Sequence, residues 1–118
     1  MQANRSQIEI EYAFETFVEK IQHMVNEHFA KNYANLTAPT IAVYPGRTYW
    51  KIVKEDAPDQ FGQQASVYGF VRKSDGAIFK AATWKAPYTK GQSAIRGYVN
   101  DSSNGMNAAT PYGIVYAR

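Results

Sequence analysis

The first third of the chain carries apolar side chains at the spacing of one helix face. Between residues 6 and 33 these positions recur every three or four residues, as expected of a single buried stripe. The stripe consists of Phe14, Phe17, Val18, Ile21, Val25, His28 and Phe29. Asn35 and Pro39 favour a helix end shortly after residue 33. Ile8 and Ile10 alternate with glutamates, so the first turn could instead be extended. The pattern predicts one long helix over residues 6–33.

After Pro39 the pattern changes to that of β-strands. Runs rich in β-branched and aromatic residues lie at 40–44, 47–54, 66–73 and 77–83. The last two flank Ser74-Asp75-Gly76, which is a hairpin signal. A two-residue turn and a three-residue loop with a left-handed Gly76 differ by one step of register. We prefer the three-residue loop, because it sorts the side chains by type. It gives one face to Val67, Val71, Phe79 and Ala81, and the other to Tyr68, Phe70, Arg72 and Lys80.

The last third of the chain has no regular period. Glycines and prolines interrupt residues 84–118, yet the segment is rich in aromatic side chains. A long irregular segment in a compact domain is typical of a functional or a disordered region, and the aromatics favour one that packs. The sequence therefore predicts an α+β fold in a single domain, residues 1–118. One long N-terminal helix packs on an antiparallel sheet of three or four strands within residues 40–83, and an irregular C-terminal segment follows.

Composition and charge narrow the possible functions. Of 118 residues, 45% are apolar and 19% charged, which is the composition of a globular protein. The absence of cysteine excludes disulfides, thiolate catalysis and cysteine zinc sites. No apolar run is long enough to span a bilayer, so no membrane partner is expected. Residues 1–35 hold three basic and five acidic groups, a net charge of −2, and residues 36–118 hold ten and five, a net of +5. This asymmetry indicates a half that meets anions.

Enzymatic chemistry has little support in the sequence. His23 and His28 lie five residues apart, which sets them about 140° apart around a helix rather than on one face. That spacing differs from the zinc-binding pair, and His28 is expected in the core. There is no Gly-x-Ser-x-Gly, no phosphate-loop sequence and no histidine in the basic half to activate a serine. We therefore predict no catalytic residue, no metal and no cofactor, and the pattern leans against an enzyme.

The candidate ligand site is a basic, aromatic stretch that follows the last predicted strand. Lysines suit phosphates, an aromatic ring or arginine plane can stack on a base, and glycines beside cations admit an anion to the backbone. The candidate ligand-binding residues are Lys80, Trp84, Lys85, Lys90 and Arg96. Pro87 stops the strand, because proline cannot donate to a ladder. Trp84 either plugs the core beneath that exit, the simpler role for a tryptophan, or floors a ligand site above it.

A set of short motifs extends over the C-terminal 60% of the chain. They are KIVKE, SVYGFVRKSDGAIFKAATWKAP with its Trp-Lys-x-Pro element, the pair Arg96-Gly97, and the closing PYGIVYAR. In these motifs the chain resembles a family of small uncharacterised tailed-phage proteins. The resemblance covers residues 49–118, and this chain differs by a longer Tyr88–Ile95 stretch before Arg96. The resemblance implies a phage origin, hence the host cytoplasm or the virion, and carries no established activity.

Three functions are compatible with these features. The leading one is a non-enzymatic phage accessory protein, homo-oligomeric, that binds a phosphate-bearing nucleotide and sequesters a host immune signal. The second is a nucleic-acid-binding protein that uses the same cations in an open groove. The third is a virion or assembly component whose C-terminal segment packs against neighbouring subunits.

Overall fold

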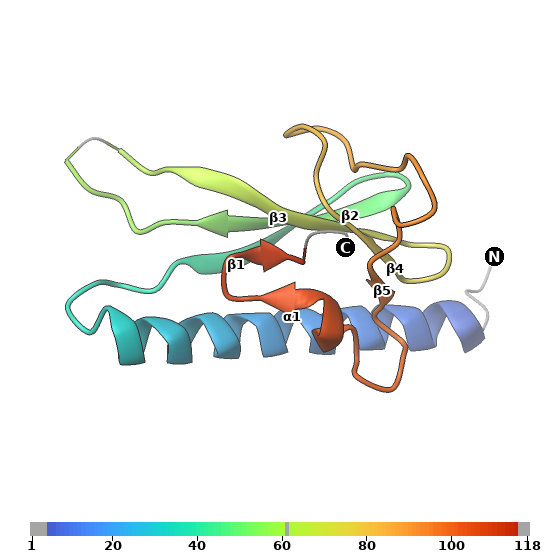
Figure 1. The fold of residues 1–118 in the computed structure, drawn as a ribbon, viewed down its shortest axis with the longest axis horizontal. Helices are drawn as coiled ribbons and strands as arrows, with labels where there is room; N and C mark the ends of the chain where they lie inside the picture. The colour runs from blue at the N-terminus through green and yellow to red at the C-terminus, as the bar shows by residue number, and fades with distance from the viewer. Residues whose placement is uncertain (1–4, 61, 116–118) are drawn as a thin grey trace.

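One long helix lies along one face of an antiparallel sheet in the computed structural model, which describes residues 5–60 and 62–115 (Figure 1). The sheet has five strands in the order β1-β2-β3-β4-β5, and a two-stranded sheet pairs β6 with β7. The elements are α1 (Arg5–Asn32), β1 (Thr40–Pro45), β2 (Tyr49–Glu55), β3 (Ala65–Arg72), β4 (Ala77–Phe79), β5 (Gly97–Tyr98), the 3₁₀ helix η1 (Met106–Ala108), β6 (Ala109–Thr110) and β7 (Gly113–Ile114). The predicted α+β fold is confirmed.

The core lies between α1 and the sheet. Four residues of the predicted helical stripe are buried there, namely Phe14, Phe17, Ile21 and Val25. They belong to one apolar cluster with residues of β2, β3, β4 and β7, including Ile52, Val71, Ile78 and Ile114. The first turn of the helix is helical rather than extended, since α1 already includes Ile8 and Ile10. The three-four periodicity therefore identified both the helix and its buried face.

His28 is not the core residue that the stripe predicts. It is half-buried, and its Nε2 lies 3.0 Å from the Tyr112 hydroxyl in the turn between β6 and β7. The rings of Tyr112 and Tyr33 meet it edge-on, at centroid distances of 5.1 and 5.8 Å. The next residue of the stripe, Phe29, still packs against the core cluster but is only partly buried, so His28 lies at the edge of the core. His28 instead joins the end of the helix to the β6–β7 turn.

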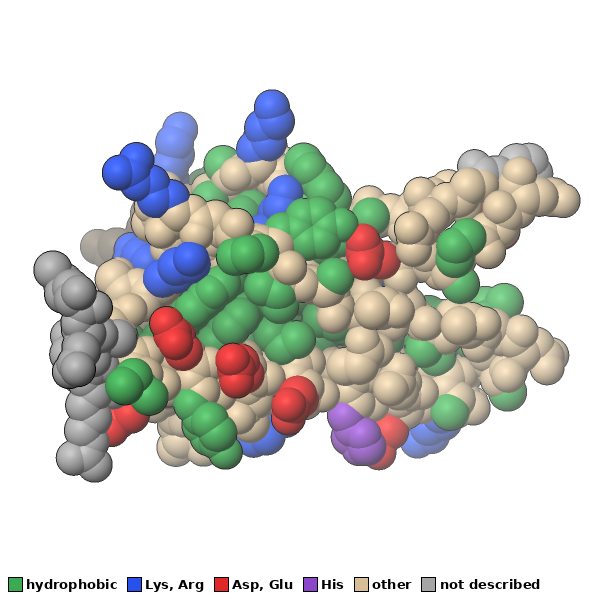
Figure 2. All heavy atoms as spheres, turned by 180° about the vertical axis from the view of Figure 1, so that it is seen from behind, with side chains coloured by type: hydrophobic (Ala, Val, Ile, Leu, Met, Phe, Trp, Pro, Cys, Tyr) green, Lys and Arg blue, Asp and Glu red, His purple; other side chains and the backbone are tan. Residues whose placement is uncertain are grey.

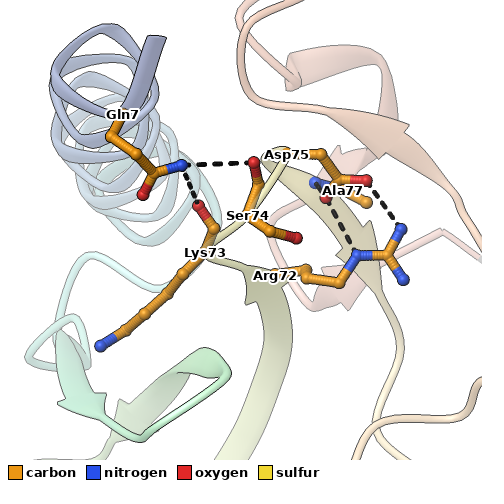
Figure 3. Close-up of polar contacts among 6 residues, drawn as sticks. All are labelled: Gln7, Arg72, Lys73, Ser74, Asp75 and Ala77. Atoms are coloured by element: carbon orange, nitrogen blue, oxygen red, sulfur yellow. Dashed lines mark hydrogen bonds and ion pairs between the residues drawn. The ribbon is translucent and has the colours of Figure 1, made fainter. Parts of the chain in front are cut away.

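The loop between β3 and β4 has four residues rather than three. Phe70 pairs with Phe79 and Val71 with Ile78, so Arg72 stands opposite Ala77. The Asp75 carboxylate accepts hydrogen bonds from Arg72 Nε (3.0 Å) and Nη2 (2.7 Å) and from the Ala77 amide (3.1 Å) (Figure 3). Gly76 has a φ of 79°, as the hairpin signal predicts. In the predicted three-residue loop, Lys73 would be the last paired residue of the strand. The bidentate ion pair of Arg72 with Asp75 instead makes Arg72 the last paired residue, so Lys73 joins the loop.

The helix helps to fix this loop. Gln7 Nε2 lies 3.3 Å from the carbonyl oxygens of both Lys73 and Ser74, so α1 holds the hairpin at its tip (Figure 3). The interaction spans 66 and 67 residues of sequence. A contact between such distant residues leaves no trace in the local pattern around the turn.

The predicted assignment of side chains to the two sheet faces is therefore wrong. Phe70 and Phe79 share the outer face, meaning the face turned away from α1, with Arg72, whose guanidinium lies 5.2 Å from the Phe79 ring centroid. Val71 belongs to the core cluster on the helix side. Tyr68 also packs there, because the register of β2 with β3 shifts between Ile52 and Val53. One extra residue at such a bulge moves a side chain to the opposite face.

The last predicted strand, 77–83, is shorter than expected, because it ends at Phe79. The C-terminal segment is irregular for most of its length, as predicted, and includes the short elements β5, η1, β6 and β7 within residues 97–114. These strands have two residues each, which is too short to show a period in sequence. The loop that follows β4 lies on the side of the sheet opposite α1, whereas the chain after β5 returns to the helix, where Asn104 Nδ2 donates to the Ala13 carbonyl at 2.9 Å (Figure 1).

Candidate ligand-binding cleft

A tight loop, residues 80–88, follows β4 and is called the tip loop here. The Tyr88 amide donates to the Lys80 carbonyl (2.8 Å), and Ala81 forms a bridge with Pro87. At its apex the Thr83 hydroxyl oxygen accepts hydrogen bonds from the amides of Lys85 (3.1 Å) and Ala86 (3.2 Å). A threonine hydroxyl commonly closes a turn in this way. The loop therefore presents Trp84 and Lys85 at a fixed apex.

Lys51 of β2 fastens this apex to the sheet. Its Nζ donates to the Trp84 carbonyl (3.0 Å) and lies 4.1 Å from the Trp84 ring centroid. Tyr44, the partner of Lys51 across β1 and β2, places its ring 5.6 Å from the same ammonium. The Tyr44 and Trp84 rings meet edge-on at 6.4 Å. Such a cation between two aromatic rings is held by their negative faces.

The environment of Trp84 decides between its two predicted roles. Its side chain is 44% exposed and lies outside both apolar clusters. The core-plug interpretation is therefore wrong. Lys51 lies over the ring, and a large part of the indole remains open to solvent.

A cleft of about 530 Å³ lies on the outer face, between the β1–β2 turn and the tip loop. Its lining residues are Tyr44, Pro45, Gly46, Arg47, Thr48, Tyr49, Lys51, Phe70, Lys85, Ala86 and Pro87. Three of these side chains are cationic and three are aromatic. All eleven belong to the part of the chain that the structure describes, and none is a carboxylate.

The aromatic floor of the cleft is held by packing. The Tyr49 ring stands edge-on to Phe70 at 6.1 Å and to Phe79 at 5.8 Å. These edge-to-face contacts are favourable and fix the orientation of the ring.

Tyr44 at the edge of the cleft is hydrogen-bonded to a carboxylate. Its hydroxyl donates to Glu55 Oε2 at 2.6 Å. This hydrogen bond raises the pKa of Tyr44, so the phenol stays neutral at physiological pH.

The five predicted ligand-binding residues do not converge on one point. Lys85 lines the cleft, and Trp84 borders it through its contacts with Lys51. Lys90 is exposed and lies outside the cleft lining. Lys80 and Arg96 form a separate pair, and Lys80 Nζ donates to the Ile114 carbonyl at 2.8 Å. The basic, aromatic stretch is divided because the tip loop folds back on itself and carries Lys85 away from Lys80 and Arg96.

The sequence prediction missed Arg47 and Lys51 and the aromatic lining of the cleft. One signal was available. Side chains alternate along a strand, so Tyr49 and Lys51 had to share the face opposite Trp50. Trp50 indeed stacks on Phe14 of the helix, at a centroid distance of 4.1 Å, which leaves Tyr49 and Lys51 on the outer face. The tip loop brings Lys85 to this face, and no local pattern in the sequence predicts that loop.

The surface charge is separated in space as well as in sequence. Figure 2 shows acidic side chains in a row along the helix, with most of the visible lysine and arginine side chains above them and a few at the lower edge. The exposed glutamates of α1 include Glu9, Glu11, Glu15 and Glu19. Anions are therefore attracted to the sheet side of the molecule.

The described residues were also searched for a metal site and for a membrane-spanning helix, and neither was found. Within residues 5–60 and 62–115, no group of three or more histidine, aspartate or glutamate side chains is placed to hold a metal ion. Across the same residues, no helix combines the length and apolarity that crossing a bilayer requires.

Comparison with known proteins identifies a family without an assigned activity. The profile of DUF7717, a family of unknown function, matches residues 1–108 of the 118. Neither the curated proteins nor the solved structures contain a significant match to this chain.

Proposed function

The chain belongs to the DUF7717 family of unknown function, and we propose that it is a non-enzymatic protein that binds a phosphate-bearing nucleotide in the cleft beside the tip loop. One observation carries this proposal. The cleft brings Arg47, Lys51 and Lys85 together with aromatic rings, and its lining includes no carboxylate. A nucleotide combines the two chemistries that such a lining recognises, namely negative phosphates and a flat base.

In this proposal each part of the cleft has its own role. Arg47 and Lys85 are exposed and stand on opposite sides of it, one in the β1–β2 turn and one in the tip loop, so both can donate charge-assisted hydrogen bonds to phosphate oxygens. Tyr49 and Phe70 offer a fixed aromatic floor for a base. The volume of about 530 Å³ lies within the range of small-molecule sites, about 300–1,000 Å³.

The biological role that we propose is sequestration. A binding protein that catalyses no reaction acts by lowering the free concentration of its ligand. The sequence resemblance to small tailed-phage proteins supports a ligand of the infected host, and the class that we propose is a nucleotide immune signal. This assignment rests on the resemblance together with the cleft.

The test is a calorimetric titration of the purified protein with mononucleotides, linear and cyclic dinucleotides, and short single-stranded DNA and RNA. The variants are Arg47→Ala, Lys85→Ala and their combination. A hydrogen bond to a charged group contributes about 1.5–3 kcal/mol, so each substitution should weaken nucleotide binding by about 10–150-fold. Lys90→Ala is the matched control, since this exposed lysine comes from the same segment but lies outside the cleft, and its affinity should match the parent.

Three outcomes would contradict the proposal. Full affinity in the double variant would exclude the cleft as the binding site. Tight binding of DNA or RNA with a steep loss of affinity at high salt would indicate the nucleic-acid function, because many counterions are then released. No binding of any ligand by the parent, together with its presence in purified particles, would indicate the virion component.

A further inference from the structure

Lys51 differs from the other two cations of the cleft because its ammonium is already engaged. Its Nζ donates to the Trp84 carbonyl at 3.0 Å and lies 4.1 Å from the centroid of the Trp84 ring. The charged groups of Arg47 and Lys85 form no hydrogen bond or ion pair with the residues that the structure describes. Arg47 and Lys85 are therefore available to a ligand, whereas Lys51 is bound to the protein.

Two aromatic rings hold the same ammonium in place. The Tyr44 ring centroid lies 5.6 Å from Lys51 Nζ, and the Tyr44 ring meets that of Trp84 edge-on. The Tyr44 hydroxyl donates to Glu55 Oε2 at 2.6 Å, which fixes this ring from its other end. A cation is attracted to the faces of such rings, more strongly where it is shielded from water, and Lys51 is half-buried. The ammonium thus has a fixed position before any ligand binds.

The bond from Lys51 attaches the apex of the tip loop to the sheet. The hydrogen bonds that the Thr83 hydroxyl accepts also close the apex, but both lie within the loop. The contact of Lys51 with Trp84 instead joins β2 to a residue 33 positions later in the chain. Loss of this contact leaves the turn closed and frees its apex to move relative to β2. Lys85 is the next residue of the apex and moves with it.

We infer that Lys51 is a positioning residue of the cleft, which keeps Lys85 opposite Arg47 by holding the Trp84 carbonyl. This inference rests on the proposed function, in which Arg47 and Lys85 both bind phosphate oxygens. Lys51 then determines the affinity for the nucleotide through the tip loop. Fixing the loop in advance removes an entropy cost that binding would otherwise carry. A ligand that bridges Arg47 and Lys85 in turn stabilises the contact between the tip loop and β2.

The first measurement needs no ligand. Relaxation in ¹⁵N NMR gives the backbone order parameters of residues 84–86 in the parent and in Lys51→Met, which keeps a long side chain but loses the ammonium. These should lie near about 0.85 in the parent and fall below about 0.6 in Lys51→Met. Lys51→Arg keeps a charged donor that also stacks on aromatic rings, and should restore the parent values. Lys54→Met is the matched control and should match the parent, because Lys54 belongs to the same strand but lies outside the cleft lining.

The second measurement is the calorimetric titration with the same mononucleotides and dinucleotides. Lys51→Met should weaken binding by up to the loss expected for Lys85→Ala, about 10–150-fold, because it displaces the same cation. Lys51→Arg should recover the affinity, and Lys54→Met should not change it. The combined Lys51→Met, Lys85→Ala variant should bind at least about tenfold more tightly than the product of the two single losses predicts, since substitutions that act on one contact are coupled.

The two measurements separate this inference from the proposed function. Losses that simply multiply in the combined variant would show that Lys51 contacts the nucleotide directly, and would overturn the positioning role while the function stands. Order parameters in Lys51→Met that equal those of the parent would do the same. A parent that binds none of the nucleotides would refute the proposed function, and the dependence of affinity on Lys51 would fall with it, whatever the order parameters show.

Discussion

Gly105 offers a sharp test of how the C-terminal segment packs on the helix. Its φ is 78°, in the left-handed region. A Cβ added there would lie 2.8 Å from Ile78 Cδ1 and 2.9 Å from two ring atoms of Phe17, and both of these residues are fully buried. Gly91 is a matched control, because its φ is 84° and a Cβ there would meet nothing within 4 Å. An alanine would strain the backbone at both positions, but only at Gly105 would its methyl group meet neighbouring atoms.

The expected magnitudes follow from these two contributions. An alanine in the left-handed region costs about 1–2 kcal/mol, partly offset by about 0.4–1 kcal/mol from the less flexible unfolded chain. Gly91→Ala should therefore lower the free energy of unfolding by about 1 kcal/mol or less. Gly105→Ala adds overpacking of a closed core, which costs about 1–3 kcal/mol. Its total loss should be about 1–4 kcal/mol, always larger than that of Gly91→Ala.

Urea denaturation followed by circular dichroism measures both variants against the parent. The slope of the unfolding free energy against urea concentration should be unchanged, so that the shift in the midpoint of unfolding measures the change in stability. A double-mutant cycle of Gly105→Ala with Phe17→Leu should give a coupling of about 1 kcal/mol, because the added methyl group touches the Phe17 ring. Equal destabilisation by Gly91→Ala and Gly105→Ala, with no coupling to Phe17, would refute the packing of this segment on α1.

Three other substitutions test the hairpin and the tip loop. Gly76→Val should destabilise the protein far more than Ser74→Val in urea denaturation, because Gly76 has a φ of 79°; equal effects would contradict the turn. Asp75→Asn should cost about 1 kcal/mol at pH 7. Arg72 lowers the pKa of Asp75, so this stabilisation is complete above the ordinary pKa of 3.8, and the difference from the parent should vanish as the pH falls through the lowered pKa. Trp84→Ala should weaken nucleotide binding by about 1–3 kcal/mol, with a smaller loss of stability than the 3–5 kcal/mol expected for Phe17→Ala.

The parts of the fold that sequence predicts are those with a repeating local pattern. The helix is long enough for its period to repeat many times, so both its extent and its buried residues Phe17, Ile21 and Val25 are evident. The longer strands, β1 to β3, are likewise visible in β-branched and aromatic runs. In the helix and in the long strands, the same face stays buried along many residues, and this repeated burial produces the period in the sequence.

The parts that sequence could not predict depend on single distant contacts. The register of β3 with β4 follows from the ion pair of Arg72 with Asp75 and from Gln7 on the helix. The cleft requires Lys51 of β2 to meet Trp84, 33 residues away. Neither contact repeats, so neither produces a period. A charge count along the chain groups Lys85 with Arg96, whereas the folded tip loop separates them.

The edges of the sheet bear on the predicted homo-oligomer. The outward Ile41 amide of β1 donates to Gln22 Oε1 at 2.7 Å, and Gln22 Nε2 donates to the Pro39 carbonyl at 3.0 Å, so a helix side chain takes the place of a neighbouring strand. By alternation, Pro45 lies on the same outward edge and has no amide to offer. The opposite edge, β5, has only two residues. Covered or very short edges prevent pairing between sheets. A homo-oligomer of this chain is therefore expected to associate through its faces. The acidic helix of one copy and the basic outer face of another are the complementary surfaces. Because salt screens such an attraction, high salt should dissociate the oligomer, as measured by size-exclusion chromatography with light scattering.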